Sequence, residues 1–424
     1  MQDQTPAPRI ATLDTIRGVA VMGILLMNIV AFAMPEAAYM NPRAYGGDTG
    51  ANLAVWVFNF IFFDGKMRGL FSFLFGASTL LVAQKAAEAG RSPVHTHYAR
   101  MAWLLAFGLA HIWLVWFGDI LTHYAIVGSL AFLFRRLPAH KLVAIAILLI
   151  AAQTLLYAGL SFSLYVLAAQ VRAPHPSLAT VQQWTGFRSG FGVPSAAEIS
   201  HDLASFRGPW FDRVSRGLGT AVSSVTSTLA LVGLETLAYM LLGMAALKSG
   251  LLTGTLDRAR YRQWLWIGFG IGVPAYAALA AWTVASDFAM PVVGTSEITL
   301  ASPLRPAMIV AWASLIVLLA RPGGTLTARI SAAGRMAFSN YLLTSLICTT
   351  LFYGQGFALF GRLSRAELYP MVIAIWVLML LWSKPWLDRF DYGPLEWLWR
   401  SLSRGSPQPM RRRRALSLMR ATRI

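Results

Sequence analysis

The feature that most constrains this sequence is a series of apolar blocks, each about 18 to 25 residues long. As a helix, a block of this length crosses a hydrocarbon layer about 30 Å thick, with its backbone hydrogen bonds satisfied internally. Hydrophobic residues form 56% of the 424 positions and charged residues only 13%, whereas soluble domains carry about 25% charged residues. The sequence therefore predicts an all-α, polytopic membrane protein.

Ten spans are predicted, in one transmembrane domain over residues 1–405 with both termini cytoplasmic. The positive-inside rule sets this orientation, because it places about 25 of the 36 Lys and Arg residues inside and about 11 outside. No cleaved signal peptide is expected, since the first apolar run is too long and lacks an Ala-x-Ala exit. A multi-pass location in a bacterial inner membrane follows. The predicted spans are 16–34, 66–86, 98–118, 120–136, 141–170, 224–248, 262–285, 304–320, 335–353 and 368–387.

The sequence also predicts the structure of three segments that lie outside the spans. Residues 51–63 are too short to cross and are expected to lie at the interface or run into the second span. Residues 172–223 hold too much Pro and Gly for a long helix and are predicted to form an outer loop. This loop is either an ordered lid or disordered, and its aromatic residues favour the lid. Residues 406–424 are expected to be a disordered basic tail near anionic lipid. The net charge of +18 thus reflects topology, and no nucleic-acid partner is expected.

The first span carries a pair of charges and a deeper amide. Asp14 and Arg17 are three residues apart and share one side of a helix at the membrane surface. Asn28 returns to the same face about 16 Å deeper. A purely structural interpretation is that Asp14 caps the helix and pairs with Arg17. In the functional alternative, Arg17 and Asn28 line a substrate path.

The turn between the third and fourth spans is flanked by His111, Asp119 and His123. These side chains are predicted to converge, with Asp119 orienting a histidine that acts as a general base. His111 is the preferred base because it lies deeper, and His123 is a substrate contact. The structural alternatives are that Asp119 caps the next helix and that His111 is a hydrogen-bonded core residue. No metal site is expected, since no tight ligand spacing is present.

Three further ionisable residues are candidates for substrate binding. Glu235 lies near the middle of a span, so it must meet a partner inside the bundle or carry a proton. Lys66 and Arg68 start the second span beside Asp64, where they bind an anionic substrate or headgroup, or snorkel to the interface. Small residues four apart are expected to let helices pack closely, namely Ser72 with Gly76 and Gly268 with Gly272.

Several motifs resemble known families. The pattern L-D-x-x-R-G at residues 13–18 resembles the first span of the acyltransferase family 3 superfamily, in which an arginine is followed eleven positions later by a histidine. Arg17 matches this arginine, whereas Asn28 stands in place of the histidine. The stretches 65–78, 108–128, 334–345 and 391–405 resemble the YeiB-like family, domain of unknown function 418. That family is related to the same acyltransferases and to heparan-alpha-glucosaminide N-acetyltransferases.

The resemblance implies a helical membrane fold and the transfer of an acyl group, acetyl above all. The donor would be a cytoplasmic coenzyme A thioester, and the acceptor an envelope glycan, lipid or small molecule. Arg17, with Arg335 or other basic residues of the inner rim, would meet the donor phosphates. His111 would replace the missing histidine. The alternatives are a transporter of a small anionic or lipidic solute and a non-catalytic binding or scaffold protein; membrane lipids are expected partners, and a homo-oligomer is compatible with each.

Overall fold

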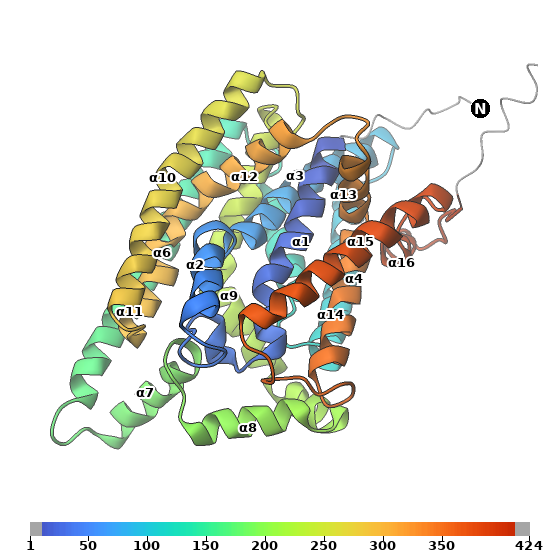
Figure 1. The fold of residues 1–424 in the computed structure, drawn as a ribbon. Helices are drawn as coiled ribbons and strands as arrows, with labels where there is room; N and C mark the ends of the chain where they lie inside the picture. Colours follow the sequence, from blue (N-terminus) through green and yellow to red (C-terminus); the bar gives the residue numbers. More distant parts are fainter. Residues whose placement is uncertain (1–10, 412–424) are drawn as a thin grey trace, which may run out of the picture.

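The computed structural model describes residues 11–411 as a bundle of long helices (Figure 1). Within these residues there is no β-strand, only an isolated bridge between Phe390 and Arg411. The all-α prediction is therefore confirmed. The principal helices are α1 (Ala11–Ala33), α2 (Gly50–Phe62), α3 (Lys66–Glu88), α4 (Pro93–Leu114), α5 (Leu121–Ala131), α6 (Ala139–Val171), α7 (Leu178–Phe191), α8 (Ala196–Arg207), α9 (Trp210–Lys248), α10 (Arg258–Ala285), α11 (Met290–Val293), α12 (Arg305–Leu319), α13 (Thr325–Arg335), α14 (Ala337–Phe352), α15 (Tyr369–Arg389) and α16 (Pro394–Arg404).

Seven helical stretches in the described chain are long and apolar enough to cross a membrane. Shorter apolar helices at Leu121–Phe134 and Ala337–Phe352 lie in the same bundle. Each of the ten predicted spans overlaps a helix, so the chain is a multi-pass membrane protein; the span count and the cytoplasmic termini stay predictions. The seven stretches are Ala11–Ala33, Gly50–Glu88, Ala139–Val171, Val222–Lys248, Arg258–Ala285, Met290–Leu319 and Ala366–Arg389.

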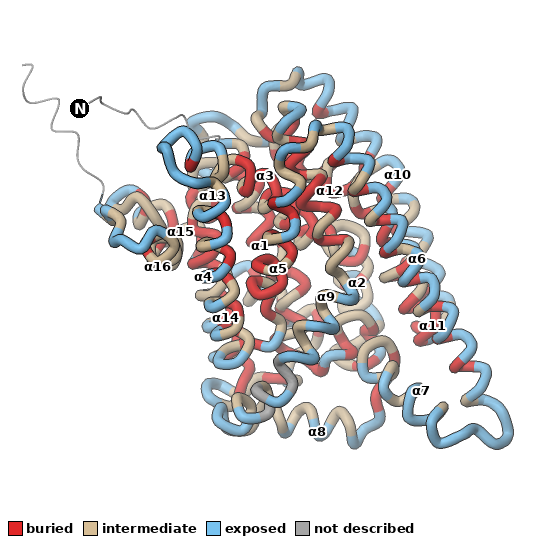
Figure 2. The backbone as a smooth tube through the Cα atoms, turned by 180° about the vertical axis from the view of Figure 1, so that it is seen from behind, coloured by how far each residue is buried: buried red, intermediate tan, exposed pale blue. Residues whose placement is uncertain are grey.

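Burial is concentrated in the middle of the bundle, along α1, α3 and α5 (Figure 2). Helices α6 and α10 lie at its edge and expose apolar side chains. Leu148 and Leu155 on α6 are 69% and 72% exposed, which suits contact with lipid. The ionisable residues His111, His123 and Glu235, which the sequence places in apolar spans, are buried in the interior, as expected for intramembrane ionisable groups.

Glycines allow the central helices to approach closely. A Cβ added at Gly243 on α9 would lie 1.7 Å from the Phe73 carbonyl oxygen of α3, and one added at Gly76 would lie 1.9 Å from the Met240 carbonyl oxygen. At Gly268 on α10 the added atom would lie 2.3 Å from the Ala307 carbonyl oxygen. Close approach at Gly76 and Gly268 confirms the packing role predicted for these residues.

Residues 172–223 are more helical than the sequence suggested. Helices α7 and α8 lie across the end of the bundle opposite to the start of α1, and α9 already begins at Trp210 (Figure 1). The prolines do not interrupt these helices, because each precedes a helix start. Ser195 begins α8 with a capping box that includes Glu198. The Trp210 indole also donates a 2.9 Å hydrogen bond to the Leu114 carbonyl oxygen, which anchors this segment to the end of α4.

Of the two other segments outside the predicted spans, residues 51–63 are described throughout and residues 406–424 as far as residue 411. Residues 50–62 form the short helix α2, and a turn with Gly65 in the left-handed region (φ +68°) leads into α3. At the C-terminal end, residues 405–411 fold back on the turn before α16, where the Asp391 N–H donates to the Met410 carbonyl oxygen at 2.9 Å. The predicted disorder of the tail concerns residues 412–424, which lie outside the described residues.

Candidate functional site

His111 and Asp119 form a buried pair where α4 turns into α5. The His111 Nδ1 atom lies 2.9 Å from Asp119 Oδ1, and both side chains are almost fully buried. The other oxygen, Asp119 Oδ2, accepts the Thr122 N–H at 2.8 Å in the first turn of α5. Asp119 therefore orients the imidazole and caps α5 at once, so the two predicted roles do not exclude each other.

The second ring nitrogen of His111, Nε2, is buried and available to accept a proton. Within residues 11–411, His111 Nε2 has no hydrogen-bond partner. The Tyr341 ring lies 5.4 Å from the imidazole, centre to centre. Tyr341 also lines a small cavity of about 10 Å³, close to the room that one water molecule needs. The polar groups around this cavity come from α1 and α14, namely Asn28, Tyr341, Thr344 and Ser345.

Arg17 lies at a different place from Asn28, although both belong to α1. Its guanidinium donates to Asp14 at 3.0 Å and to Ser78 at 2.9 Å, near the start of the helix. The predicted pairing of Asp14 with Arg17 is therefore confirmed. The predicted partner Arg335 ends α13, where its guanidinium donates to the Asp391 carbonyl oxygen at 3.1 Å.

Basic side chains, Arg17 among them, gather around Arg100 at this end of the bundle. The charges of Arg400, Arg404 and Arg17 all act on Arg100, whose guanidinium lies 4.0 Å from the Trp399 ring centre. Burial and the charges of Arg400 and Arg91 lower the pKa of Arg404. Such mutual repulsion favours binding of an anion. We call these residues the inner basic cluster, because they lie at the end of the bundle that the sequence predicts to face the cytoplasm: Arg17, Arg100, Arg400 and Arg404.

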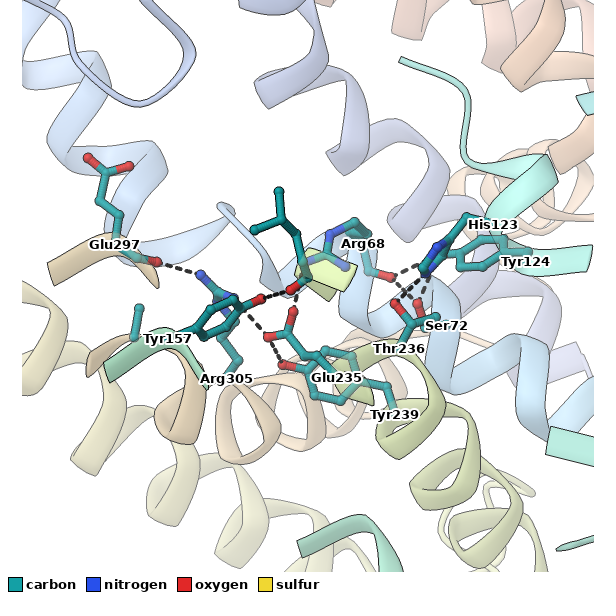
Figure 3. Close-up of polar contacts among 12 residues, drawn as sticks. Arg68, Ser72, His123, Tyr124, Tyr157, Glu235, Thr236, Tyr239, Glu297 and Arg305 are labelled. Carbon is teal, nitrogen blue, oxygen red and sulfur yellow. Dashed lines mark hydrogen bonds and ion pairs between the residues drawn. The ribbon is translucent and has the colours of Figure 1, made fainter. Parts of the chain in front are cut away.

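Glu235 is the centre of a second polar group, drawn in Figure 3. Its buried carboxylate on α9 accepts hydrogen bonds from Arg68 of α3 at 2.9 Å and from Arg305 of α12 at 2.8 Å. Tyr239, one turn further along α9, donates at 2.6 Å. The prediction that Glu235 meets a partner inside the bundle is confirmed. Arg305 was missed, because it stands at the predicted start of a span, where an arginine is unremarkable.

Lys66 does not snorkel to the interface. The residue is fully buried, and its Nζ donates to the Phe60 carbonyl oxygen at 2.5 Å and lies 3.2 Å from the Tyr276 ring centre. The snorkelling alternative is therefore wrong for Lys66. The Arg68 side chain is 26% exposed, and its Nη2 atom donates to Glu235 Oε2 at 2.9 Å.

His123 belongs to the Glu235 group by its hydrogen bond. Its Nε2 lies 2.9 Å from the Thr236 hydroxyl, and Thr236 directly follows Glu235 on α9 (Figure 3). The predicted pairing with Asp119 is thus seen for His111, whereas His123 bonds across to α9. Neighbouring hydroxyls extend this group, since Tyr124 and Ser72 share a 2.9 Å hydrogen bond.

Comparison with known proteins gives a consistent picture. The family model described as a protein of unknown function (DUF418) matches residues 246–406. The uncharacterized protein YeiB of Escherichia coli (strain K12) is 32% identical over 406 residues, which cover 93% of this chain and 96% of YeiB. The uncharacterized protein YxaH of Bacillus subtilis (strain 168) is 29% identical over 409 residues, covering 95% and 96%. No solved structure matches this chain.

Proposed function

The chain belongs to the YeiB-like family of proteins of unknown function (DUF418), and from that premise we propose that it is a membrane-embedded acyltransferase of the bacterial inner membrane. It moves an acyl group, acetyl in the first instance, from a cytoplasmic coenzyme A thioester to a hydroxyl or amine of an envelope glycan, lipid or small molecule. The observation that carries this proposal is the buried His111–Asp119 pair with its unpartnered Nε2.

The pair suits proton transfer in an acyl transfer step. The acceptor oxygen or nitrogen attacks the thioester carbonyl carbon while its proton passes to His111 Nε2. Asp119 keeps the Nδ1 proton in place and stabilises the imidazolium that forms. The carbon–sulfur bond then breaks, the new ester or amide remains, and the imidazolium returns its proton to the thiolate. Asn28, at the cavity beside Tyr341, orients the acceptor.

The inner basic cluster supplies the matching donor site. Coenzyme A carries several phosphate charges, and arginine side chains bind phosphate through paired hydrogen bonds that a lysine ammonium does not reproduce. The Arg17 guanidinium donates one hydrogen bond to Asp14 and one to Ser78, and these bonds hold it in a fixed orientation near the start of α1. A phosphate there would neutralise the repulsion among the four arginines.

The experiment compares purified His111→Gln, Arg17→Lys and wild-type protein at matched thermal stability. His97→Gln is the control, because His97 is also a buried histidine and makes one hydrogen bond, to the Gly128 carbonyl oxygen. Binding of acetyl-coenzyme A is titrated, and thiol release is followed in proteoliposomes supplied with a membrane lipid and glycan extract. His111→Gln should lower turnover by at least about 100-fold with donor affinity retained. Arg17→Lys should weaken donor binding by about tenfold.

Two results would overturn the proposal. One is undiminished turnover in His111→Gln. The other is failure of the wild-type protein to bind acetyl-coenzyme A; if that failure were accompanied by solute-dependent proton flux in liposomes, the transporter would become the better explanation. His97→Gln should leave binding and turnover unchanged, which separates the effect of the base from that of losing any buried histidine.

A further inference from the structure

Cationic side chains lie at the N-terminus of α3, where the helix dipole already places a partial positive charge. Lys66 and Arg68 lie in the first turn of this 23-residue helix, and Arg305 approaches from the start of α12. A helix N-terminus is equivalent to roughly half a positive charge, so cations there are unfavourable unless an anion joins them. We call Lys66, Arg68 and Arg305 the α3 cation cluster.

The Arg305 guanidinium lies directly against the N-terminus of α3. A Cβ added at Gly65, the residue before the helix, would lie 2.5 Å from Arg305 Nε. The Arg305 side chain is only 7% exposed, and in the described part of the chain its Nε has no hydrogen-bond partner. The Arg68 Nη1 atom is likewise buried without a partner there. Unpartnered buried donors are rare in folded proteins, and two from one cluster indicate a missing acceptor.

The acids present do not satisfy this cluster. Glu235 accepts from both Arg68 and Arg305, so one carboxylate serves two guanidinium groups. The charges of Asp64 and Glu297 act on Lys66, yet among residues 11–411 neither forms an ion pair with it. Lys66 instead faces a carbonyl oxygen and an aromatic ring. Burial without a counter-ion strongly disfavours the charged form of a lysine, so an anion beside Lys66 would favour its ammonium form.

We propose that the α3 cation cluster is a binding site for a phosphate group, carried either by a soluble anion or by a lipid headgroup. The guanidinium donors Arg305 Nε and Arg68 Nη1, together with the Lys66 side chain, match the several acceptor oxygens of a phosphate. This site is built by α3 and α12 and does not depend on acyl transfer at His111.

The test measures thermal unfolding of the full-length purified protein with two probes. Inorganic phosphate is titrated in detergent against chloride of equal ionic strength, and phosphatidylglycerol nanodiscs are compared with nanodiscs of phosphatidylcholine. Wild-type protein should be stabilised by at least one probe. Arg68→Lys keeps a positive charge near Glu235 but loses the paired donors of the guanidinium. The variant should therefore need a phosphate concentration at least about tenfold higher for the same thermal shift, or should lose the shift in phosphatidylglycerol nanodiscs. Arg43→Lys is the control, because Arg43 is an exposed arginine paired with Asp48 and Asp287.

Each outcome bears on the site. A shift with phosphate identifies a soluble anion as the source, and a shift with phosphatidylglycerol alone identifies a headgroup. If Arg68→Lys does not fold, Lys66→Met, which keeps the length of the buried side chain, should fold and lose the same shift. Equal shifts in wild type, Arg68→Lys and Lys66→Met would overturn the proposal, as would the absence of a shift with either probe. His111→Gln should keep the wild-type shift, which separates this site from the acyltransferase proposal.

Discussion

At the scale of single residues, Glu235 holds three helices by one carboxylate. Its oxygens join Arg68 of α3 and Arg305 of α12 to α9 inside the bundle. Removing one member of a buried ion pair leaves an uncompensated charge, which costs about 3–5 kcal/mol. Glu235→Gln should lower the free energy of unfolding by about this amount, measured by reversible unfolding in mixed micelles. Asp388→Asn, which disturbs an exposed pair with Lys384, should change it by less than about 1 kcal/mol. Equal effects of the two variants would contradict this account.

Glu396 makes stability depend on pH at another single position. Its carboxylate, on α16, accepts the Phe338 N–H at 2.8 Å and the Ser339 N–H at 3.0 Å, and so caps α14. Burial raises the pKa of Glu396 above its ordinary value. The folded protein thus binds this proton more tightly than the unfolded chain does.

The sign of the pH effect follows from that difference. The protonated Glu396 side chain contributes its full stabilisation below its pKa in the unfolded chain, about 4.3. This stabilisation is lost as pH rises through the higher pKa that Glu396 has in the folded protein. As pH rises above about 4.3, wild type should therefore lose stability relative to Glu396→Gln. Unfolding midpoints of both proteins across this range measure the effect, and parallel curves would rule it out.

At the scale of helices, α3 and α9 can cross closely because Gly243 has no side chain at their contact. Gly243 faces the Phe73 carbonyl oxygen so closely that alanine must push the helices apart. Overpacking of this kind costs about 1–3 kcal/mol. Gly243→Ala should therefore destabilise the protein, followed as a lower unfolding midpoint in detergent.

The same helix provides the control for this prediction. Gly233 has nothing within 4 Å of an added Cβ, so Gly233→Ala should be neutral or stabilise by up to about 1 kcal/mol through helix propensity. If both substitutions raised stability, the close crossing would be wrong.

The helices themselves were largely predictable, and their ends were less so. Apolar blocks of spanning length predicted α1, α3, α6, α10 and α15 because length and composition act locally. The helices of residues 172–223 were not predicted, because their Pro and Gly content suggested loop, although each Pro precedes a helix start. Before α12, a π-helical segment at Gly294–Leu300 continues the helical path into the interior and buries Arg305, which no periodicity in the sequence indicates.

At the scale of the whole molecule, the orientation in the membrane can be tested at α6. This helix has 33 residues, about 50 Å at 1.5 Å per residue, so it is long enough to cross with a margin. Reporter fusions after Arg136 and after Val171 should therefore report opposite sides, the first cytoplasmic by the positive-inside rule. Detection of both fusions on one side would overturn the topology. A fusion after Ala320, also expected inside, serves as the control.

The candidate site was predictable only where its members are close in sequence. His111 and Asp119 are eight residues apart across one turn, so helix geometry alone predicts that they can meet. Arg305 and Glu235 are 70 residues apart, and their contact depends on how α9 and α12 pack, which one sequence does not specify. The same holds for the inner basic cluster, where α16 brings Arg400 beside Arg100.

The cap that Glu396 places on α14 links the cavity to α16. Helix α16 is short and strongly amphipathic, with Glu396 at its start and Arg404 at its end. Helix α14 begins under that carboxylate and carries Thr344 and Ser345, which line the cavity, about 8 Å further along. A helix is stiff over so short a length, so the start of α14 and the residues that line the cavity would move together. A shift of α16 would thus alter the shape of the cavity that Tyr341, Thr344 and Ser345 line, without any ligand having entered the bundle.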